Sequence, residues 1–267
     1  MSGASFSIVI CSIDAARYAR VTALYRALFA GTAFEIIGIH DARSLAEAYN
    51  RAAARATGDI VVFSHDDIDI ASTGMPGALT RAAAALDVIG IVGTSRLVDA
   101  FWPTAGHPWL HGWMSMPSRN GPGYYVHVYG VDAAITPGLQ AIDGMLFAVR
   151  RPVLQAIAFD AATFDGFHGY DVDFSCTACL AGWRVGITAE IAVIHESGGD
   201  FGSGWETYRT RFATKYEGRL APASGAKPWS MARVLLPSKD AILRQMTPAR
   251  LVAITAQLRA KAAPRPE

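Results

Sequence analysis

The residues best suited to chemistry follow a hydrophobic stretch near residue 60. Residues 59–64 are typical of a buried strand, and four polar residues come directly after it: His65, Asp66, Asp67 and Asp69. In an open α/β sheet, ligands bind beyond the carboxyl ends of the strands. Carboxylates this close together repel one another unless a cation lies among them, and oxygen ligands suit Mg²⁺ or Mn²⁺. The segment therefore predicts a metal site, although a solvated turn with an aspartate helix cap explains the same residues equally well.

Two further polar segments could face the same site. Asp171 and Asp173 stand where a helix is expected to begin, and capping and the helix dipole alone favour aspartate there. His195 ends an extended segment over residues 184–194, and a single histidine in that place is more often structural than a ligand. Taken one at a time, neither segment requires a chemical role.

The first hundred residues alternate between two hydrophobic patterns. Strands are expected over residues 6–11, 34–39, 59–64 and 88–93, and helices over residues 15–30, 44–56 and 78–86. Ser44 and Glu47 fit a capping box at the start of the second helix. The alternation predicts βαβ units and therefore an α/β fold, with a mostly parallel central sheet flanked by helices.

Residues 94–140 interrupt this pattern with a segment rich in glycine, proline and aromatic residues. Its rings include those of Trp102, Trp109, Trp113, Tyr124, Tyr125 and Tyr129. A loop of this length inside a compact domain is usually functional. The segment is expected to be an insertion whose rings either form a binding surface or pack as an ordinary loop core.

Several motifs, taken in order, carry more information than any one of them. They lie at residues 7–12, 44–63, 65–67, 141–151, 167–175 and 193–197. Over roughly residues 6–200 the chain resembles the glycosyltransferases of the GT-A fold, of the inverting family 2 type. His65-Asp66-Asp67 occupies the position of the family's DxD motif, with His65 in place of the first aspartate. Tyr170 replaces the acid that usually precedes the residue matched by Asp171.

The resemblance implies a role for each matching residue. Asp171 would be the general base, and Asp67 and His195 would bind the metal. The residues that would hold the donor nucleotide and its sugar are Cys11, Ser12, Asp41, Asn50, His65, Asp66, Asp143 and Gly144. The aromatic insertion would then be the wall on the acceptor side, because sugar faces pack well on flat rings.

The activity implied by the resemblance is an inverting, metal-dependent sugar transfer that uses Mn²⁺ or Mg²⁺. The donor would be a nucleoside diphosphate sugar, with UDP favoured, and the acceptor a hydroxyl of a glycan, a lipid-linked sugar or a small molecule. A non-catalytic module that binds nucleotide sugars or glycans is an alternative. A nucleotidyltransferase is another, although Cys11-Ser-Ile-Asp14 stands where a glycine-rich phosphate loop would be expected. No nucleic-acid partner is expected.

Charge divides the chain unevenly. The 267 residues are 51% hydrophobic and carry a net charge of +1, which indicates a folded protein and little else. Residues 1–205 hold 12 basic and 19 acidic residues, whereas residues 206–267 hold 12 basic and 4 acidic ones. We expect a GT-A domain over residues 1–205 and a basic helical extension over residues 206–267, with a helix over residues 239–263 that breaks near Pro248. The extension would contact an anionic membrane surface or an acidic partner, or would be merely solvated.

The location expected for the protein is the cytoplasm, with peripheral contact to the inner face of the membrane. Three cysteines are too few for a disulfide framework. The opening segment lacks the basic start of a secretory signal, and no run approaches the length that spans a bilayer. The oligomeric state stays open.

Overall fold

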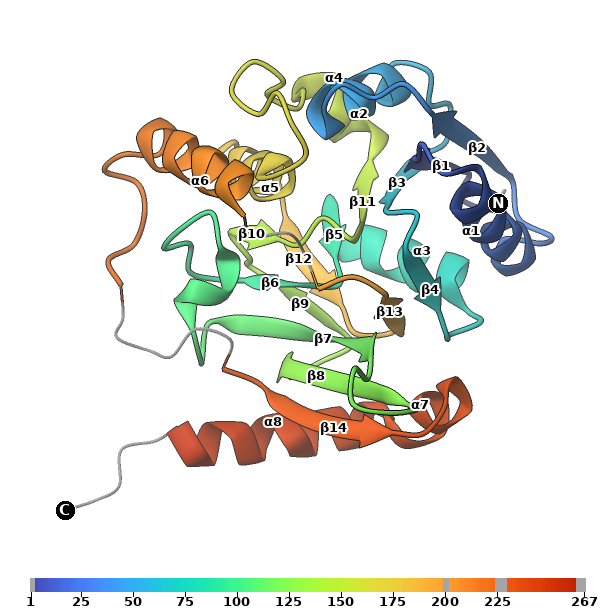
Figure 1. Cartoon of the computed structure of the whole chain (residues 1–267), viewed down its shortest axis with the longest axis vertical. Helices are drawn as coiled ribbons and strands as arrows, with labels where there is room; N and C mark the ends of the chain where they lie inside the picture. Colours follow the sequence, from blue (N-terminus) through green and yellow to red (C-terminus); the bar gives the residue numbers. More distant parts are fainter. Residues whose placement is uncertain (1–2, 199–201, 224–229, 263–267) are drawn as a thin grey trace.

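The amino-terminal half alternates strands and helices as the hydrophobic pattern predicts, in a computed structural model that describes residues 3–198, 202–223 and 230–262. It contains β1 (Phe6–Cys11), α1 (Ala15–Leu28), β2 (Phe34–Ile39), α2 (Leu45–Ala53) and β3 (Ile60–Ser64). β1 lies between β2 and β3 and is parallel to both. The connection from β1 through α1 to β2 and the connection from β2 through α2 to β3 run in opposite directions across the sheet. Because both connections are right-handed, α1 and α2 lie on opposite faces of the sheet (Figure 1). The Ser44 hydroxyl accepts the Glu47 N–H at 3.1 Å, as expected of a helix cap.

The first sheet is mixed, so the expectation of a mostly parallel sheet is corrected in this detail. Its order is β2-β1-β3-β11-β5-β12-β9, and it is completed by β5 (Val88–Gly90), β9 (Ile135–Pro137), β11 (Leu146–Arg150) and β12 (Val185–Thr188). β11 is antiparallel to both of its neighbours, and β9 is antiparallel to β12. A strand that is buried on both faces has the same hydrophobic pattern in either direction, which is why the sequence could not show this.

A second sheet begins where the expected strand over residues 88–93 divides. β5 ends at Gly90 in the first sheet, and β6 (Val92–Thr94) belongs to the second. The second sheet has the order β10-β6-β7-β13-β4, with β8 beside β7 and β14 beside β8. Its further strands are β4 (Ile68–Ile70), β7 (Leu110–Pro117), β8 (Tyr124–Gly130), β10 (Ala141–Ile142), β13 (Val193–His195) and β14 (Ala232–Leu236).

The aromatic segment over residues 94–140 is therefore no open loop. It holds the 3₁₀ helix η1 (Trp102–Ala105) and the antiparallel pair β7 and β8. Trp113 and Tyr129 are buried, at 4% and 1% exposure, and Trp102 packs edge-on against Tyr129. Most of these rings build the second sheet, and only part of the segment reaches the site described below.

The helices that follow α2 are α3 (Met75–Ala85), α4 (Arg151–Ala156), α5 (Tyr170–Leu180) and α6 (Ser203–Lys215), and α6 lies beside α5 (Figure 1). α5 begins after Gly169, whose φ of 75° lies in the left-handed region that favours glycine. No side chain caps this helix. Neither Asp171 nor Asp173 caps the helix, although both lie in its first turn, where the helix dipole favours acids.

The carboxyl-terminal segment joins the second sheet. α7 (Lys239–Gln245) and α8 (Pro248–Ala262) confirm the helix that breaks near Pro248. β14, which precedes them, was not expected, and it pairs in antiparallel fashion with β8. Leu236, Ile242 and Leu251 share a buried cluster with Trp113 and Val128 of the second sheet. The division of the chain at residue 205 stays a prediction.

Ion pairs connect the basic carboxyl-terminal segment to the acidic remainder of the chain. The pairs are Arg209–Asp99, Arg211–Asp165, Lys215–Asp160, Lys215–Asp173, Lys239–Asp69 and Arg259–Asp132. Two of these acids, Asp69 and Asp173, lie in polar segments that the sequence associated with the predicted metal site. Protein cations thus already neutralise part of the negative charge of residues 1–205.

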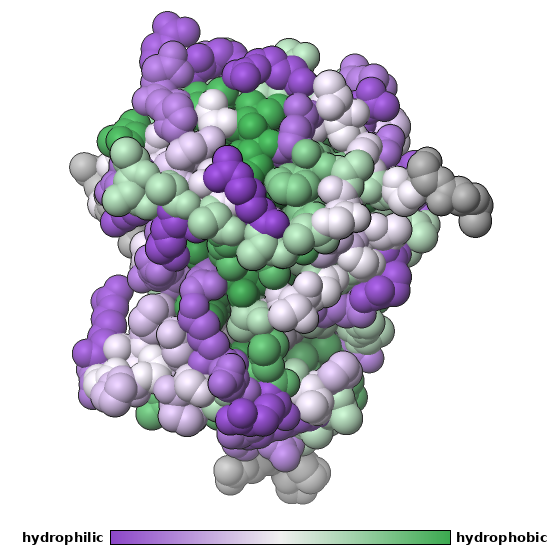
Figure 2. Space-filling view, turned by 90° about the vertical axis from the view of Figure 1, so that its right-hand side faces the viewer, coloured by the Kyte–Doolittle hydropathy of each residue, from purple (hydrophilic) through white to green (hydrophobic). Residues whose placement is uncertain are grey.

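No helix in the described part of the chain is a candidate membrane span. None of its helices combines the length and the hydrophobicity needed to cross a bilayer. On the face shown in Figure 2, hydrophobic residues gather in hollows between projecting hydrophilic residues.

Candidate active site

Two strand pairings bring distant segments together at the carboxyl end of β3. β11 runs against β3, so that Leu146, at its beginning, lies opposite Ser64, and the His65 N–H donates to the Met145 carbonyl at 3.0 Å. β13 runs against β4, and His195 lies opposite Ile68. The first pairing places residues 143–145 beside His65, and the second places His195 beside Asp67.

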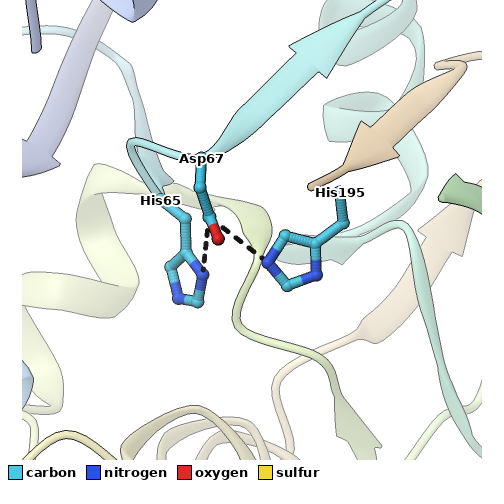
Figure 3. A group of neighbouring side chains, drawn as sticks. All are labelled: His65, Asp67 and His195. Carbon is cyan, nitrogen blue, oxygen red and sulfur yellow. Dashed lines mark ion pairs between the residues drawn. The ribbon is translucent and has the colours of Figure 1, made fainter. Parts of the chain in front are cut away.

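Three side chains converge where these strands meet: His65, Asp67 and His195 (Figure 3). The Oδ1 atom of Asp67 lies 3.3 Å from Nε2 of His195 and 3.7 Å from Nδ1 of His65. One possible ligand atom from each residue lies within 4.8 Å of the other two. Asp67 and His195 are each only 13% exposed, whereas His65 is 30% exposed. The sequence marked all three residues, and the structure brings them together.

The charges of this cluster depend on one another. Burial alone would raise the pKa of Asp67, but the hydrogen bond and charge of His195 hold it well below its usual range. Burial likewise opposes a charged His195, yet Asp67 outweighs it and raises the pKa of that imidazole. Burial, assisted by His195, lowers the pKa of His65. The contacts of the cluster therefore favour the ionised form of Asp67, the charged form of His195 and the neutral form of His65.

The donor set fits a divalent metal ion. Two imidazole nitrogens and one carboxylate oxygen are the ligands that borderline transition ions accept, whereas Mg²⁺ prefers oxygen atoms alone. Ser197 provides a further polar atom, since its hydroxyl lies 3.2 Å from Nε2 of His195. His65, Asp67 and His195 could thus hold a metal, and they would favour Mn²⁺ over Mg²⁺.

The opposite wall of the pocket is the beginning of α5 together with residues 143–145. Asp171 packs against Gly144 so closely that a Cβ at position 144 would lie 2.8 Å from Oδ2 of Asp171 and would also meet the Tyr170 hydroxyl. Asp143 is held in place by Trp102, whose Nε1–H donates to Oδ2 at 3.0 Å, and by the Met145 N–H at 3.0 Å. Glycine at position 144 is therefore required by the approach of α5.

Burial raises the pKa of both Asp171 and Asp173, and the two carboxyls differ in their partners. Burial, reinforced by the Asp143 carboxylate, raises the pKa of Asp171 to about 7. Asp173, two residues further on, is 2% exposed and pairs with Lys215 at 2.7 Å and with the Tyr216 hydroxyl at 2.8 Å. Asp171 lines the pocket, whereas Asp173 has its partners inside the protein. A carboxyl whose pKa lies near neutral pH is suited to exchange a proton.

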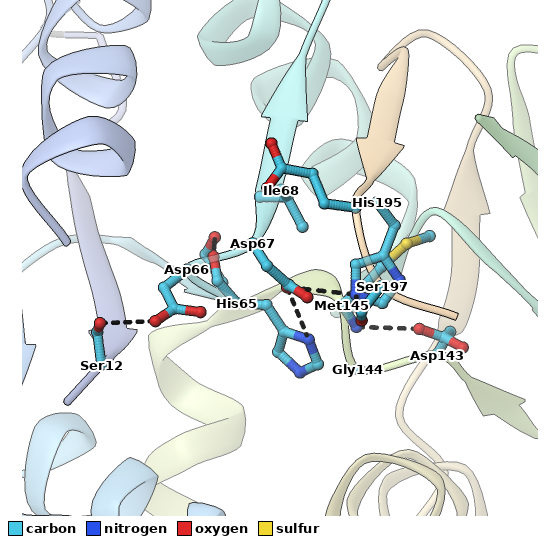
Figure 4. A network of polar contacts seen from close by, with 12 residues as sticks. Ser12, His65, Asp66, Asp67, Ile68, Asp143, Gly144, Met145, His195 and Ser197 are labelled. Atoms are coloured by element: carbon cyan, nitrogen blue, oxygen red, sulfur yellow. Dashed lines mark hydrogen bonds and ion pairs between the residues drawn. The ribbon is translucent and has the colours of Figure 1, made fainter. Parts of the chain in front are cut away.

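A second group of predicted residues lies on the β1 and β2 side of the site. The Ser12 hydroxyl donates to Oδ2 of Asp66 at 2.6 Å and joins the end of β1 to the loop after β3 (Figure 4). Cys11 precedes Ser12, and burial raises the pKa of its thiol to about 12, so it is no nucleophile. Asp41 is exposed and pairs with Arg51 at 2.9 Å. The proposed contacts of these residues with a nucleotide stay predictions.

Asn50 lies apart from this group. Its side-chain N–H donates to the Phe159 carbonyl at 2.8 Å, and its side-chain oxygen accepts the Phe159 N–H at 2.9 Å. The amide thus joins α2 to the segment after α4. The structure gives a packing role to Asn50 and offers no support for the predicted contact with the donor.

Several residues of the site were not found from the sequence. Phe101 and Trp205 line the same pocket as Asp171 and His195, together with Phe167 and His168 of the motif over residues 167–175. Phe101 and Trp205 meet edge to face, with ring centroids 5.6 Å apart, although they lie about a hundred residues apart in the chain. Arg20 of α1 donates to the carbonyls of Asp66 and Ile68 at 3.0 and 3.2 Å and so holds the loop that carries Asp67. Nothing local in the sequence marks Arg20 or Trp205, because their partners are distant.

The relationship of the chain to known proteins agrees with this geometry. Residues 7–216, well over half of the chain, match the sequence model of the Glycosyltransferase like family. The chain belongs to this family. The match extends beyond the motifs between residues 6 and 200 and includes α6, whose Trp205 reaches the pocket.

Two relatives of this glycosyltransferase-like protein show the range of the similarity. The streptomycin biosynthesis protein StrF of Streptomyces griseus is 26% identical over 181 residues, which cover 65% of this chain and 60% of StrF. The mannosyltransferase PcManGT of Pyrobaculum calidifontis, solved with GDP-Man and Mn²⁺, superimposes with a TM-score of 0.51 at 14% identity. That superposition covers all of this chain and 77% of PcManGT. The fold is therefore that of the GT-A glycosyltransferases.

Proposed function

We propose that the protein is an inverting glycosyltransferase that depends on a divalent metal ion. The observation that carries the proposal is a pocket with two chemically different walls. One wall holds the possible metal ligands His65, Asp67 and His195, and the other holds Asp171, a carboxyl with a pKa of about 7. Family membership supplies the reaction class. Transfer with inversion needs the same two chemical functions, a cation beside the leaving diphosphate and a base beside the acceptor hydroxyl.

The chain's own residues would act mainly by positioning and by moving one proton. Asp171 accepts the proton of the acceptor hydroxyl while that oxygen bonds to the anomeric carbon and the bond from this carbon to the diphosphate breaks. Burial, and after it the nearby carboxyl of Asp143, which Trp102 and the Met145 N–H hold in place, would raise the pKa of Asp171 for this step. A metal bound at the opposite wall would supply positive charge for the departing diphosphate.

Mn²⁺ is the ion we propose, because two of the three donor atoms are imidazole nitrogens. For the donor we propose a nucleoside diphosphate sugar that lies along the carboxyl ends of β1 and β3, near Ser12 and Asp66. UDP-sugars remain the first choice, and GDP-sugars belong in the same test because PcManGT was solved with GDP-Man.

For the acceptor we propose a hydroxyl on a sugar ring, in a glycan, a lipid-linked sugar or a small molecule. Phe101, Phe167 and Trp205 line the pocket beside Asp171, and Phe167 is 54% exposed. Flat rings beside a base provide a surface for the apolar face of a sugar. The similarity to StrF, whose name places it in streptomycin biosynthesis, makes a small-molecule acceptor the first to try.

A thermal-shift screen followed by product analysis tests the proposal. A panel of UDP- and GDP-sugars with and without Mn²⁺ should raise the melting temperature for one donor only when the metal is present. The matching turnover assay should release a nucleoside diphosphate, slowly without acceptor and faster with one, and EDTA should stop it. Binding without any release of nucleoside diphosphate would identify a non-catalytic module. Release of pyrophosphate from a nucleoside triphosphate would identify a nucleotidyltransferase.

A cytoplasmic location with peripheral membrane contact is a separate proposal. The exposed side chains of Leu243 and Val252 and the cations Arg244, Arg250 and Lys261 occupy α7 and α8, and these three cations are not among those of the ion pairs described above. Binding of the full chain to vesicles with anionic lipids should fall when these three cations are replaced by glutamine. Equal sedimentation of both proteins would end the membrane proposal.

A further inference from the structure

Tyr170 connects the two walls of the pocket. It is the first residue of α5, is 4% exposed, and directly precedes Asp171. Its hydroxyl oxygen lies 2.9 Å from Nε2 of His65 and 3.4 Å from the Gly144 carbonyl. The other ring nitrogen of His65, Nδ1, faces Asp67. His65 is thus held on one side by α5 and presents its second nitrogen to the cluster.

The two partners of the Tyr170 hydroxyl determine which way its hydrogen bonds run. A carbonyl oxygen can only accept, so the contact with Gly144 uses the single hydrogen of the hydroxyl. The hydroxyl oxygen is then free to accept from His65, which requires a hydrogen on Nε2. Since a neutral imidazole carries one N–H, Nδ1 is left with its lone pair. The 3.7 Å between Nδ1 and Asp67 is too long for a hydrogen bond that would favour the opposite tautomer.

The packing around Tyr170 leaves this arrangement little freedom. A side chain at position 144 would collide with the hydroxyl, so the close approach exists only because residue 144 is glycine. The ring of Tyr170 also packs edge-on against Tyr49, with centroids 5.4 Å apart, in the main core. The hydroxyl is therefore held at a defined position by the core behind it.

We propose that Tyr170 is a positioning residue that holds His65 in its Nε2–H form and thereby makes Nδ1 the third metal-ligand atom beside Asp67 and His195. This inference rests on the proposed metal-dependent function. It gives a purpose to both departures from the family pattern, because His65 and Tyr170 replace two acids with a pair that contact each other. The contact between Tyr170 and His65 also joins α5, which carries Asp171, to the wall that holds the possible metal ligands.

The test uses the full-length protein and its Tyr170→Phe variant, which loses only the hydroxyl. Long-range ¹H–¹⁵N correlation spectra of the metal-free protein, with the His65 signals assigned through a His65→Gln variant, report the tautomer directly. We expect the Nε2–H form in the native protein and a mixture of tautomers in Tyr170→Phe. Titration with Mn²⁺ should show about 10- to 100-fold weaker binding by Tyr170→Phe, as is usual when the partner of a ligating histidine is removed.

Tyr216→Phe is the matched control. It removes another hydroxyl that contacts α5, on the side of Asp173, and should leave both the tautomer of His65 and Mn²⁺ affinity unchanged. An Nδ1–H tautomer in the native protein, or equal Mn²⁺ affinity in the native protein and Tyr170→Phe, would overturn the inference. Failure of the native protein to bind Mn²⁺ would instead remove the metal from the proposed function, so the two failures are distinguishable.

Discussion

The two walls of the pocket use the same kind of side chain in opposite ways. Asp67 lies between two imidazoles, and the charge of His195 keeps its carboxyl ionised even though it is buried. Asp171 is buried beside another carboxylate, and its pKa rises to about 7. In the proposed function, one wall would hold a cation and the other would hold or release a proton. The difference comes entirely from what each carboxyl contacts, since both are aspartates at the end of a regular element.

Replacing Asp171, the carboxyl proposed to take up the proton, should have the largest effect on the rate of transfer. Asp171→Asn should lower the rate of transfer by about 10³-fold, because general-base catalysis contributes about 10²- to 10⁴-fold. Binding of Mn²⁺ and of the donor should remain, as thermal shift can show. A variant that transfers sugar at the native rate would exclude Asp171 as the base.

The same variant should gain stability, which separates its effect from misfolding. The pKa of Asp171 is about 7 in the folded protein and ordinarily 3.8, so the folded state binds the proton more tightly. The free energy of unfolding therefore falls as the pH rises from about 4 to 7. At pH 8, Asp171→Asn should be more stable than the native protein by about 1 to 3 kcal/mol, measured by chemical denaturation. A less stable variant would contradict the assigned burial and charge.

Replacing Asp67, the carboxylate of the wall with the possible metal ligands, should act by lowering the affinity for Mn²⁺. Asp67→Asn should weaken Mn²⁺ binding by more than about 100-fold and reduce transfer by a similar factor at limiting metal. Calorimetric titration with Mn²⁺ measures the first effect and the dependence of rate on Mn²⁺ the second. Asp69→Asn is the control, because Asp69 pairs with Lys239 and lies outside the cluster. Equal losses in the two variants would mean that the cluster is not the metal site.

The dependence of rate on pH, measured at saturating Mn²⁺ so that the metal wall stays loaded, should report the second wall. Below a pH of about 7, kcat/KM should fall by about tenfold for each pH unit as Asp171 takes up its proton. Asp143→Asn should move this limb to lower pH, because it removes the carboxylate that assists burial in raising the pKa. An unchanged limb in that variant would show that Asp143 does not control Asp171.

The smallest effect on catalysis is expected for replacement of Asp173, which lies two residues after Asp171 in α5. Asp173→Asn keeps the shape of the side chain but removes the charge that pairs with Lys215. Loss of the ion pair opposes relief of a buried charge whose pKa burial raises, and Lys215 keeps its pair with Asp160, so stability should change by less than about 2 kcal/mol. The rate of transfer should stay within about threefold of the native value. A rate loss comparable to that of Asp171→Asn would erase the distinction between these two carboxylates.

Local patterns were sufficient for the part of the fold that is built from neighbouring residues. The alternation of β1 to β3 with α1 and α2 followed from hydrophobic period and capping, and the polar ends of β3 and β13 marked His65, Asp67 and His195. These signals lie within a few residues of the feature that they predict. The order of the motifs then placed the cluster and Asp171 on one edge of the sheet.

The rest depended on contacts between distant residues. A buried strand carries no mark of its direction, so the antiparallel β11, which places Asp143 beside His65, was not predictable. The pairing of β14 with β8 and the reach of Trp205 into the pocket are equally non-local. The acids Asp69 and Asp173 seemed available for a cation because their partners Lys239 and Lys215 lie 170 and 42 residues away along the chain.

The ion pair between Asp173 and Lys215 affects when α5 can pack during synthesis of the chain. Asp173 is made 42 residues before Lys215, and it is 2% exposed once α5 is packed. Until Lys215 leaves the ribosome, packing of α5 would enclose a carboxylate without its cation, which is costly. The domain therefore reaches its final electrostatic state only when α6 has been translated. A shortened chain that stops before Lys215 would retain the site residues but lose the cation that makes burial of Asp173 tolerable.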